Sequence, residues 1–231
     1  MEYLPNGLTL ALTPGAFPLS TDSMILARFV RLPKQAKVLD LGAGCGTLGL
    51  LLCARDSGCH VTGLELDEAA HRGALENITR NQLESRMESI CCDLRLLPQE
   101  FTGRFDCCVS NPPYFSGGTA SSRTPLARRE DCCTPEDLFA AAGKALRFGG
   151  DFFLVHKPER LAELIVRGSE VNLEAKRLLL LRHRTDSPIA LICLQFRKGG
   201  KPGLTIEENS LYDCEHNPTA FYKSVYHMTE D

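Results

Sequence analysis

The chain has 231 residues, of which 43% are hydrophobic and 24% charged, values typical of one soluble globular domain with little room for a second. A formal net charge of −3 excludes a generally basic protein, so an RNA partner would have to be held by local basic patches. No segment approaches the roughly 20 apolar residues that cross a membrane. Residues 1–12 lack the pattern of a secretory signal, which predicts a cytoplasmic protein with no membrane partner.

The eleven cysteines do not follow a metal-binding pattern. No CxxC occurs, and the sequence instead has three adjacent pairs, at 91–92, 107–108 and 132–133. Neighbouring residues of a strand face opposite sides of a sheet. We therefore interpret the cysteines as small buried hydrophobes kept reduced, and we expect no bound metal.

From residue 37 onward, short apolar segments alternate with amphipathic ones. In chain order the pattern predicts strand 37–41, helix 46–55, strand 60–65, helix 67–82 and strands 87–92 and 105–110. A helix then begins at Thr134 with a cap, a proline at its first position and Asp137 in capping-box spacing, and it stops at Gly149–Gly150. Strand 151–156, helix 158–168 and strands 175–182 and 189–197 follow, the last two joined by a polar turn as in an antiparallel hairpin.

This alternation predicts an α/β fold with an open, mainly parallel, seven-stranded sheet that ends in a C-terminal antiparallel hairpin. We expect a single domain over residues 1–231. It would consist of an N-terminal extension (1–36), a catalytic core (37–198) and a polar C-terminal tail (199–231) draped over the body.

The first predicted strand ends in a glycine-rich turn, in which Gly42, Gly44 and Gly46 alternate with other residues. Ligands of open α/β sheets bind at the carboxyl ends of the strands, and glycines allow the backbone to approach them closely. Glu65 ends the second strand, where its carboxylate can accept hydrogen bonds from two ribose hydroxyls. Gly44, Gly46 and Gly49, with an acid about twenty residues on, also match the GxGxxG pattern of nicotinamide-dependent oxidoreductases, so the glycines alone do not settle the class of enzyme.

The tetrapeptide Asn111-Pro112-Pro113-Tyr114 directly follows the fourth predicted strand. Two prolines stiffen the turn. The Asn111 amide oxygen and the Pro112 carbonyl can then accept both hydrogens of a planar NH₂ group and direct its lone pair toward a methyl group. Tyr114 offers a flat face for stacking a base or an amide. This arrangement favours methyl transfer to an sp² nitrogen.

The segment Asp40-Leu-Gly-Ala-Gly resembles the first motif of class I methyltransferases, which have a Rossmann-like fold. Nearly the whole chain resembles the bacterial tRNA(adenine-N6)-methyltransferases that modify the adenine 3′ of the anticodon in a valine tRNA. The matching segments are Ser20–Leu26, Asn111–Phe115, Ala127–Glu130, Thr134–Leu138, His156–Arg160 and Arg197–Gly203.

The resemblance implies S-adenosylmethionine as the cofactor and tRNA as the partner. It places Asp40 near the methionine amino group, Asp93 beside the cofactor adenine, and the segment with Thr21 and Asp22 at the methionine end of the pocket. A nearby basic group, Arg123, Arg128 and Arg129, is a candidate contact for RNA phosphates, with a solvated loop as the alternative.

Other activities remain open from the sequence. Methylation of a glutamine side-chain amide in a protein such as a release factor uses the same tetrapeptide, but those enzymes carry a helical domain where this chain has 36 residues. A DNA adenine methyltransferase would need a longer target-recognition segment than residues 115–133. A non-catalytic protein that binds the cofactor or RNA is the alternative outside enzymology.

Overall fold

The computed structural model describes residues 2–4, 7–12, 19–113 and 133–226. Its centre is an eight-stranded sheet in the order β10-β8-β9-β7-β6-β3-β4-β5. The strands are β3 (Lys37–Leu41), β4 (His60–Glu65), β5 (Met87–Cys91), β6 (Phe105–Ser110), β7 (Leu146–His156), β8 (Leu173–Arg184), β9 (Ile189–Lys198) and β10 (Thr205–Tyr212). Only β9 runs antiparallel to its neighbours. The predicted mainly parallel α/β sheet with an antiparallel hairpin is therefore confirmed.

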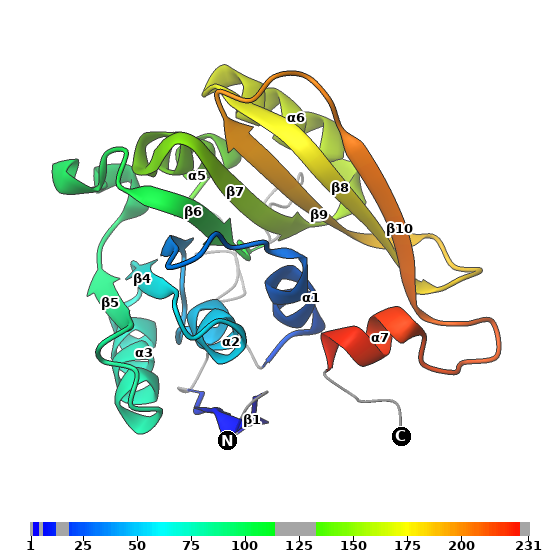
Figure 1. Ribbon diagram of the computed structural model, residues 1–231, viewed down its shortest axis with the longest axis horizontal. Coiled ribbons are helices and arrows are strands. Elements are labelled where there is room, and N and C mark those ends of the chain that lie inside the picture. The colour runs from blue at the N-terminus through cyan, green and yellow to red at the C-terminus, as the bar shows by residue number, and fades with distance from the viewer. Residues whose placement is uncertain (1, 5–6, 13–18, 114–132, 227–231) are drawn as a thin grey trace, which may run out of the picture.

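Helices cover both faces of the sheet (Figure 1). One face carries α1 (Thr21–Phe29), α2 (Thr47–Arg55), α3 (Glu68–Arg80) and α7 (Ala220–Val225), and the other carries α5 (Pro135–Ala145) and α6 (Leu161–Glu170). Single-turn helices η2 (Leu94–Leu96), η3 (Gln99–Phe101) and η4 (Pro158–Arg160) and a small hairpin of β1 (Glu2–Tyr3) and β2 (Thr9–Leu10) complete the fold.

The sheet separates two hydrophobic clusters. Cys107 and Cys108 are both fully buried, yet the first packs into the α1–α2–α3 cluster and the second into the α5–α6 cluster. This confirms for one pair that adjacent cysteines of a strand face opposite sides. Cys91 is exposed because β5 lies at the edge of the sheet. The expectation of burial is therefore wrong for this cysteine.

Helix α5 begins as the sequence predicts but ends earlier. The Thr134 hydroxyl accepts from the Asp137 N–H at 3.2 Å, and the Asp137 carboxylate accepts from the Thr134 N–H at 3.1 Å. Strand β7 then starts directly at Leu146, so Gly149 and Gly150 lie inside a strand rather than after a helix. The pairing of β7 with β6 is irregular in this region, and Gly149 takes a φ of +76°, which a glycine tolerates.

The terminal segments contain structure that the sequence analysis did not predict. The supposed C-terminal tail provides β10, an eighth strand that pairs in parallel with β8, followed by α7. The N-terminal extension provides α1. The Tyr226 hydroxyl lies 3.1 Å from the Thr21 hydroxyl, so the chain after α7 returns to the start of α1.

Candidate functional site

The carboxyl ends of β3, β4 and β6 lie side by side at one edge of the sheet, with β3 between the other two. Residues 42–46 leave β3 at this edge and lead into α2. The N–H groups of Gly42 and Ala43 donate to the Leu64 carbonyl of β4 at 3.0 and 2.9 Å, which fixes the first part of the loop.

The loop glycines have conformations that other residues rarely adopt. The φ angles of Gly42, Gly44 and Gly46 are +77°, +56° and +84°. Among the described residues, a Cβ at Gly42 or Gly44 would meet no atom within 4 Å, whereas a Cβ at Gly46 would come within 2.8 Å of the Met87 side chain. The first two glycines therefore border open space, and the third packs against the body.

Asp40 lies on β3 just before the loop and is only 1% exposed. Neither of its carboxylate oxygens has a hydrogen-bond partner of normal geometry among the described residues. Burial raises the pKa of Asp40 to about 7, the charge of Glu65 adds to the rise, and the Gly49 N–H opposes it. A buried carboxyl with so little hydrogen bonding is costly to keep, which is typical of a site that awaits a cationic or hydrogen-bonding ligand.

Glu65 ends β4 opposite the glycine loop. One carboxylate oxygen accepts from the Gly44 N–H at 2.7 Å, and the other accepts from the Asp67 N–H at 2.8 Å. The side chain is half-buried, and each oxygen keeps capacity for another donor. The structure thus brings Asp40, the glycine loop and Glu65 together.

Asp93 follows β5 and caps the single turn η2. It accepts from the Arg95 N–H at 2.9 Å, and the Arg95 guanidinium contacts both carboxylate oxygens. This hydrogen-bonded ion pair lowers the pKa of Asp93, and the Arg95 N–H lowers it further. Asp93 therefore stays ionised at the same edge of the sheet.

Asn111 follows the end of β6, which is fixed by a 2.7 Å hydrogen bond from the Ser110 hydroxyl to the Leu41 carbonyl. The Asn111 amide nitrogen donates to the Ser23 hydroxyl of α1 at 2.9 Å and lies 3.5 Å from the Ser20 hydroxyl. Pro112 is buried and Pro113 half-buried. The catalytic turn predicted from the sequence therefore contacts the segment that contains Thr21 and Asp22.

Asp22 is half-buried in the first turn of α1. Burial raises the pKa of its carboxyl, and the positive charge of Lys157, just after β7, opposes the rise. Four predicted site residues, Tyr114, Arg123, Arg128 and Arg129, lie outside the described residues.

Two residues that the sequence analysis did not select belong to this region. Ser23 holds Asn111, and Asn77 of α3, fully buried, donates from its amide nitrogen to the Cys45 carbonyl of the glycine loop at 3.0 Å. Both carry a recognisable signal. Ser20-Thr-Asp-Ser before an apolar run is typical of a helix start, and Asn77 is a polar residue on the face of α3 that also carries Ala70, Ala74 and Ile78.

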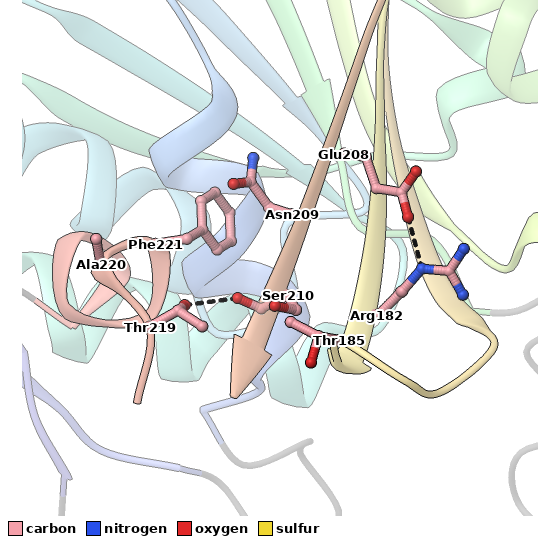
Figure 2. Close-up of a pocket in the computed structure, with 8 residues that line it drawn as sticks. All are labelled: Arg182, Thr185, Glu208, Asn209, Ser210, Thr219, Ala220 and Phe221. Atoms are coloured by element: carbon pink, nitrogen blue, oxygen red, sulfur yellow. Dashed lines mark hydrogen bonds and ion pairs between the residues drawn. The ribbon is translucent and has the colours of Figure 1, made fainter. Parts of the chain in front are cut away.

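A separate cavity of about 330 Å³ lies between β8, β10 and α7 (Figure 2). The ion pair of Arg182 with Glu208 borders it, and the Thr219 hydroxyl donates to the Ser210 carbonyl at 2.6 Å. None of the predicted site residues that the structure describes lines it. Within the described residues, no His, Cys, Asp and Glu side chains gather in a group that could hold a metal ion, and no helix is long and apolar enough to cross a membrane.

Two solved structures of similar fold are named as methyltransferases. A predicted O-methyltransferase, protein Atu636 from Agrobacterium tumefaciens, superimposes with a TM-score of 0.74 at 22% identity and covers 90% of this chain and 96% of its own. A methyltransferase from Pyrococcus furiosus gives a TM-score of 0.63 at 22% identity, with 84% of this chain and 90% of its own covered.

The sheet order, the glycine loop and the acidic residues beside it thus define a class I, S-adenosylmethionine-dependent methyltransferase. The model of the methyltransferase small domain family matches residues 18–172, and the chain belongs to this family.

Curated relatives bear the name tRNA1(Val) (adenine(37)-N6)-methyltransferase. The protein from Shewanella sp. (strain W3-18-1) is 34% identical over 92% of this chain and 90% of its own. The protein from Dickeya chrysanthemi (strain Ech1591) is 30% identical over 80% of this chain and 75% of its own. These relatives confirm the resemblance that the sequence motifs indicated.

Proposed function

We propose that the protein transfers the methyl group of S-adenosylmethionine to the exocyclic amine of an adenine in tRNA. The names of the curated relatives support this substrate. The observation that carries the proposal is the Asn111 amide, which is held by its nitrogen at the end of β6, so that its oxygen remains as an acceptor for an NH₂ group.

The cofactor would lie along the carboxyl edge of β3, β4 and β5. The open space beside Gly42 and Gly44 fits a ligand that approaches the backbone, with Gly46 leading into α2. The unpartnered carboxyl of Asp40 fits a nearby amino group, and Glu65 has free capacity for ribose hydroxyls. We assign Asp93 to the adenine end.

The methionine end of the pocket would be closed by the first turn of α1. Thr21 and Asp22 lie there, and the 2.9 Å contact of Ser23 with Asn111 brings this turn to the catalytic residues. When bound, the cofactor supplies an electrophilic methyl group on a sulfonium ion.

The chain's own groups would orient the nucleophile. Asn111 Oδ1 and the Pro112 carbonyl accept the two hydrogens of the adenine amine, Pro113 stiffens the turn, and Tyr114 stacks on the base. Methyl transfer to the amine nitrogen would break the carbon–sulfur bond of the cofactor, and one of the hydrogens held by Asn111 Oδ1 and the Pro112 carbonyl would leave as a proton to solvent. A conjugated amine is a weak nucleophile, so orientation contributes more than a strong base would.

The target adenine must leave its stack, which costs less in a single-stranded loop than in a duplex. Arg123, Arg128 and Arg129 are the proposed phosphate contacts. Neutralising them should weaken tRNA binding and flatten its salt dependence, and an unchanged salt slope would contradict this part of the proposal. We also propose a cytoplasmic location, in keeping with a tRNA substrate, and a single catalytic domain over residues 1–231.

The test is methyl transfer from labelled S-adenosylmethionine to unmodified bulk tRNA by the purified chain, followed by mass spectrometry of the digested nucleosides. We expect N6-methyladenosine. Transfer to a release-factor protein but not to tRNA would replace the substrate with a glutamine amide, and cofactor binding without any transfer would indicate a non-catalytic protein.

A further inference from the structure

Helix α1 contacts the catalytic turn through a hydrogen bond between Ser23 and Asn111, to which no role has yet been assigned. Ser23 is only 6% exposed and lies in the first turn of α1, 88 positions from Asn111 in the sequence. Its hydroxyl accepts a hydrogen bond from the Asn111 amide nitrogen at 2.9 Å. Among the described residues, the Asn111 amide oxygen has no hydrogen-bond partner.

From this geometry we infer that Ser23 is a positioning residue that sets the orientation of the Asn111 carboxamide. The two ends of a carboxamide have nearly the same shape but opposite hydrogen-bonding roles. If the group were reversed, its N–H donors would face the N–H donors of the target amine, and the amine could not be held. The inference deepens the proposed function and rests on it.

Ser23 is itself held rigidly. The Ser20 hydroxyl caps α1 by accepting from the Ser23 N–H at 3.1 Å, and it donates to the Ser23 hydroxyl, also at 3.1 Å. Because the Ser23 oxygen already receives one proton from Ser20, its remaining lone pair matches an N–H donor such as the Asn111 amide.

Helix α1 is in turn fixed to the sheet. Phe29 at its end packs edge-on against Phe153 of β7, with ring centroids 6.0 Å apart, and the Arg55 guanidinium of α2 donates to the Val30 carbonyl at 2.8 Å. The hydroxyl of Ser23 is therefore a fixed point against which the amide of Asn111 is aligned.

The experiment compares the effect of Ser23→Ala in two backgrounds, with kcat and KM for tRNA, the Kd of S-adenosylmethionine and the Tm measured for each protein. In the wild-type background we expect kcat to fall about tenfold while the cofactor Kd changes less than about twofold, because one hydrogen bond of ordinary strength no longer biases the amide. Ser169→Ala, which removes a hydroxyl bonded to a carbonyl on the distant α6, is the matched control and should leave kcat unchanged.

The second background is Asn111→Asp. A carboxylate presents an acceptor oxygen in either orientation, so Ser23→Ala should then change kcat by less than about twofold, whatever the activity of Asn111→Asp itself. An equal loss in both backgrounds would mean that Ser23 acts on the fold rather than through the amide, and would overturn the inference. An active wild type with an equally active Ser23→Ala variant would also overturn it, without touching the proposed function. If the wild-type protein methylates no tRNA, both the proposed function and the positioning role of Ser23 are overturned.

Discussion

The carboxylate of Glu65 accepts a hydrogen bond from the backbone N–H of Gly44 at 2.7 Å, although 21 positions separate the two residues in the sequence. The other oxygen of the same carboxylate accepts from the Asp67 N–H at 2.8 Å. Glu65 therefore ties the loop after β3 to the turn after β4. Its side chain shapes the proposed cofactor site before any ligand binds.

Replacing Glu65 tests both roles. In Glu65→Gln an amide NH₂ replaces one oxygen and faces a backbone N–H, so one donor is left unsatisfied. We expect a loss of about 1–3 kcal/mol in the free energy of unfolding and weaker binding of S-adenosylmethionine in calorimetry. Glu68→Gln, at an exposed residue that forms an ion pair with Arg72, is the control and should change neither quantity appreciably. Unaltered cofactor affinity in Glu65→Gln would contradict the ribose assignment.

Two glycines of the same loop should respond differently to alanine. Gly44→Ala adds a Cβ in open space, so its cost to folding is limited to about 1–2 kcal/mol for a left-handed backbone. The added methyl should nevertheless weaken cofactor binding about tenfold, because it occupies space proposed for the ligand. Gly46→Ala carries the same strain and also brings its Cβ to 2.8 Å from Met87, so its Tm should fall further. Equal losses of Tm and affinity in the two variants would show that the loop has no open side.

Asn111→Ala should abolish most of the catalytic activity and leave the affinity for the cofactor nearly unchanged. It deletes the acceptor for the target amine, so we expect kcat to fall about a hundredfold or more. The Kd of S-adenosylmethionine should stay within about threefold, since binding would depend on the glycine loop, Asp40 and Glu65. Single-turnover methylation and calorimetry measure the two effects. A large loss of cofactor affinity would instead make Asn111 a structural residue.

The central strands could be predicted because burial on both faces makes parallel strands nearly continuous apolar runs, as in Val38–Leu41. Strand β10 was missed because it lies at the edge of the sheet. There Glu207 and Glu208 form ion pairs with Arg177 and Arg182 of β8 instead of burying apolar side chains.

In the candidate site, too, some residues can be recognised from a local sequence motif, whereas others are brought together only by the fold. Motifs contiguous in the sequence, such as Asp40–Gly46 and Asn111–Pro113, could be recognised from the residues themselves, the first of them with the help of its resemblance to a known family. The contact of Ser23 with Asn111 joins distant segments and follows only from how α1 packs on the sheet, which no local pattern shows.

Asn77 connects α3 to the backbone of Ala11 and to Cys45 of the glycine loop. Its amide oxygen accepts from the Ala11 N–H at 2.8 Å, and its nitrogen donates to the carbonyls of Ala11 and Cys45 at 2.9 and 3.0 Å. Asn77→Ala leaves the buried Cys45 carbonyl and the partly buried backbone groups of Ala11 without these partners and should cost about 2–4 kcal/mol in urea unfolding. Asn81→Ala, at a less buried residue that bonds Thr9, is the comparison and should cost less. A smaller loss for Asn77 than for Asn81 would contradict this account.

Asp40 should give the protein a distinctive dependence of stability on pH. Its pKa is about 7 in the folded protein and near 3.8 in an unfolded chain, so between these values the folded state holds a proton that the unfolded state releases. The resulting stabilisation is complete below about pH 4 and is lost as the pH rises through 7, and it amounts to about 4 kcal/mol at most. Asp40→Asn cannot titrate. The difference in unfolding free energy between wild type and variant should therefore shift in favour of the variant from pH 5 to pH 8, whereas parallel profiles would show that Asp40 is already ionised.

The same titration predicts a proton exchange when the cofactor binds. If the methionine ammonium group of S-adenosylmethionine lies beside Asp40, its positive charge favours the carboxylate and lowers the pKa of Asp40. At pH 6, where Asp40 of the free protein is mostly protonated, binding should release close to one proton. Calorimetry in two buffers of different ionisation enthalpy measures this number, and Asp40→Asn should abolish the release. A wild type that binds the cofactor at pH 6 without releasing a proton would place the ammonium group away from Asp40.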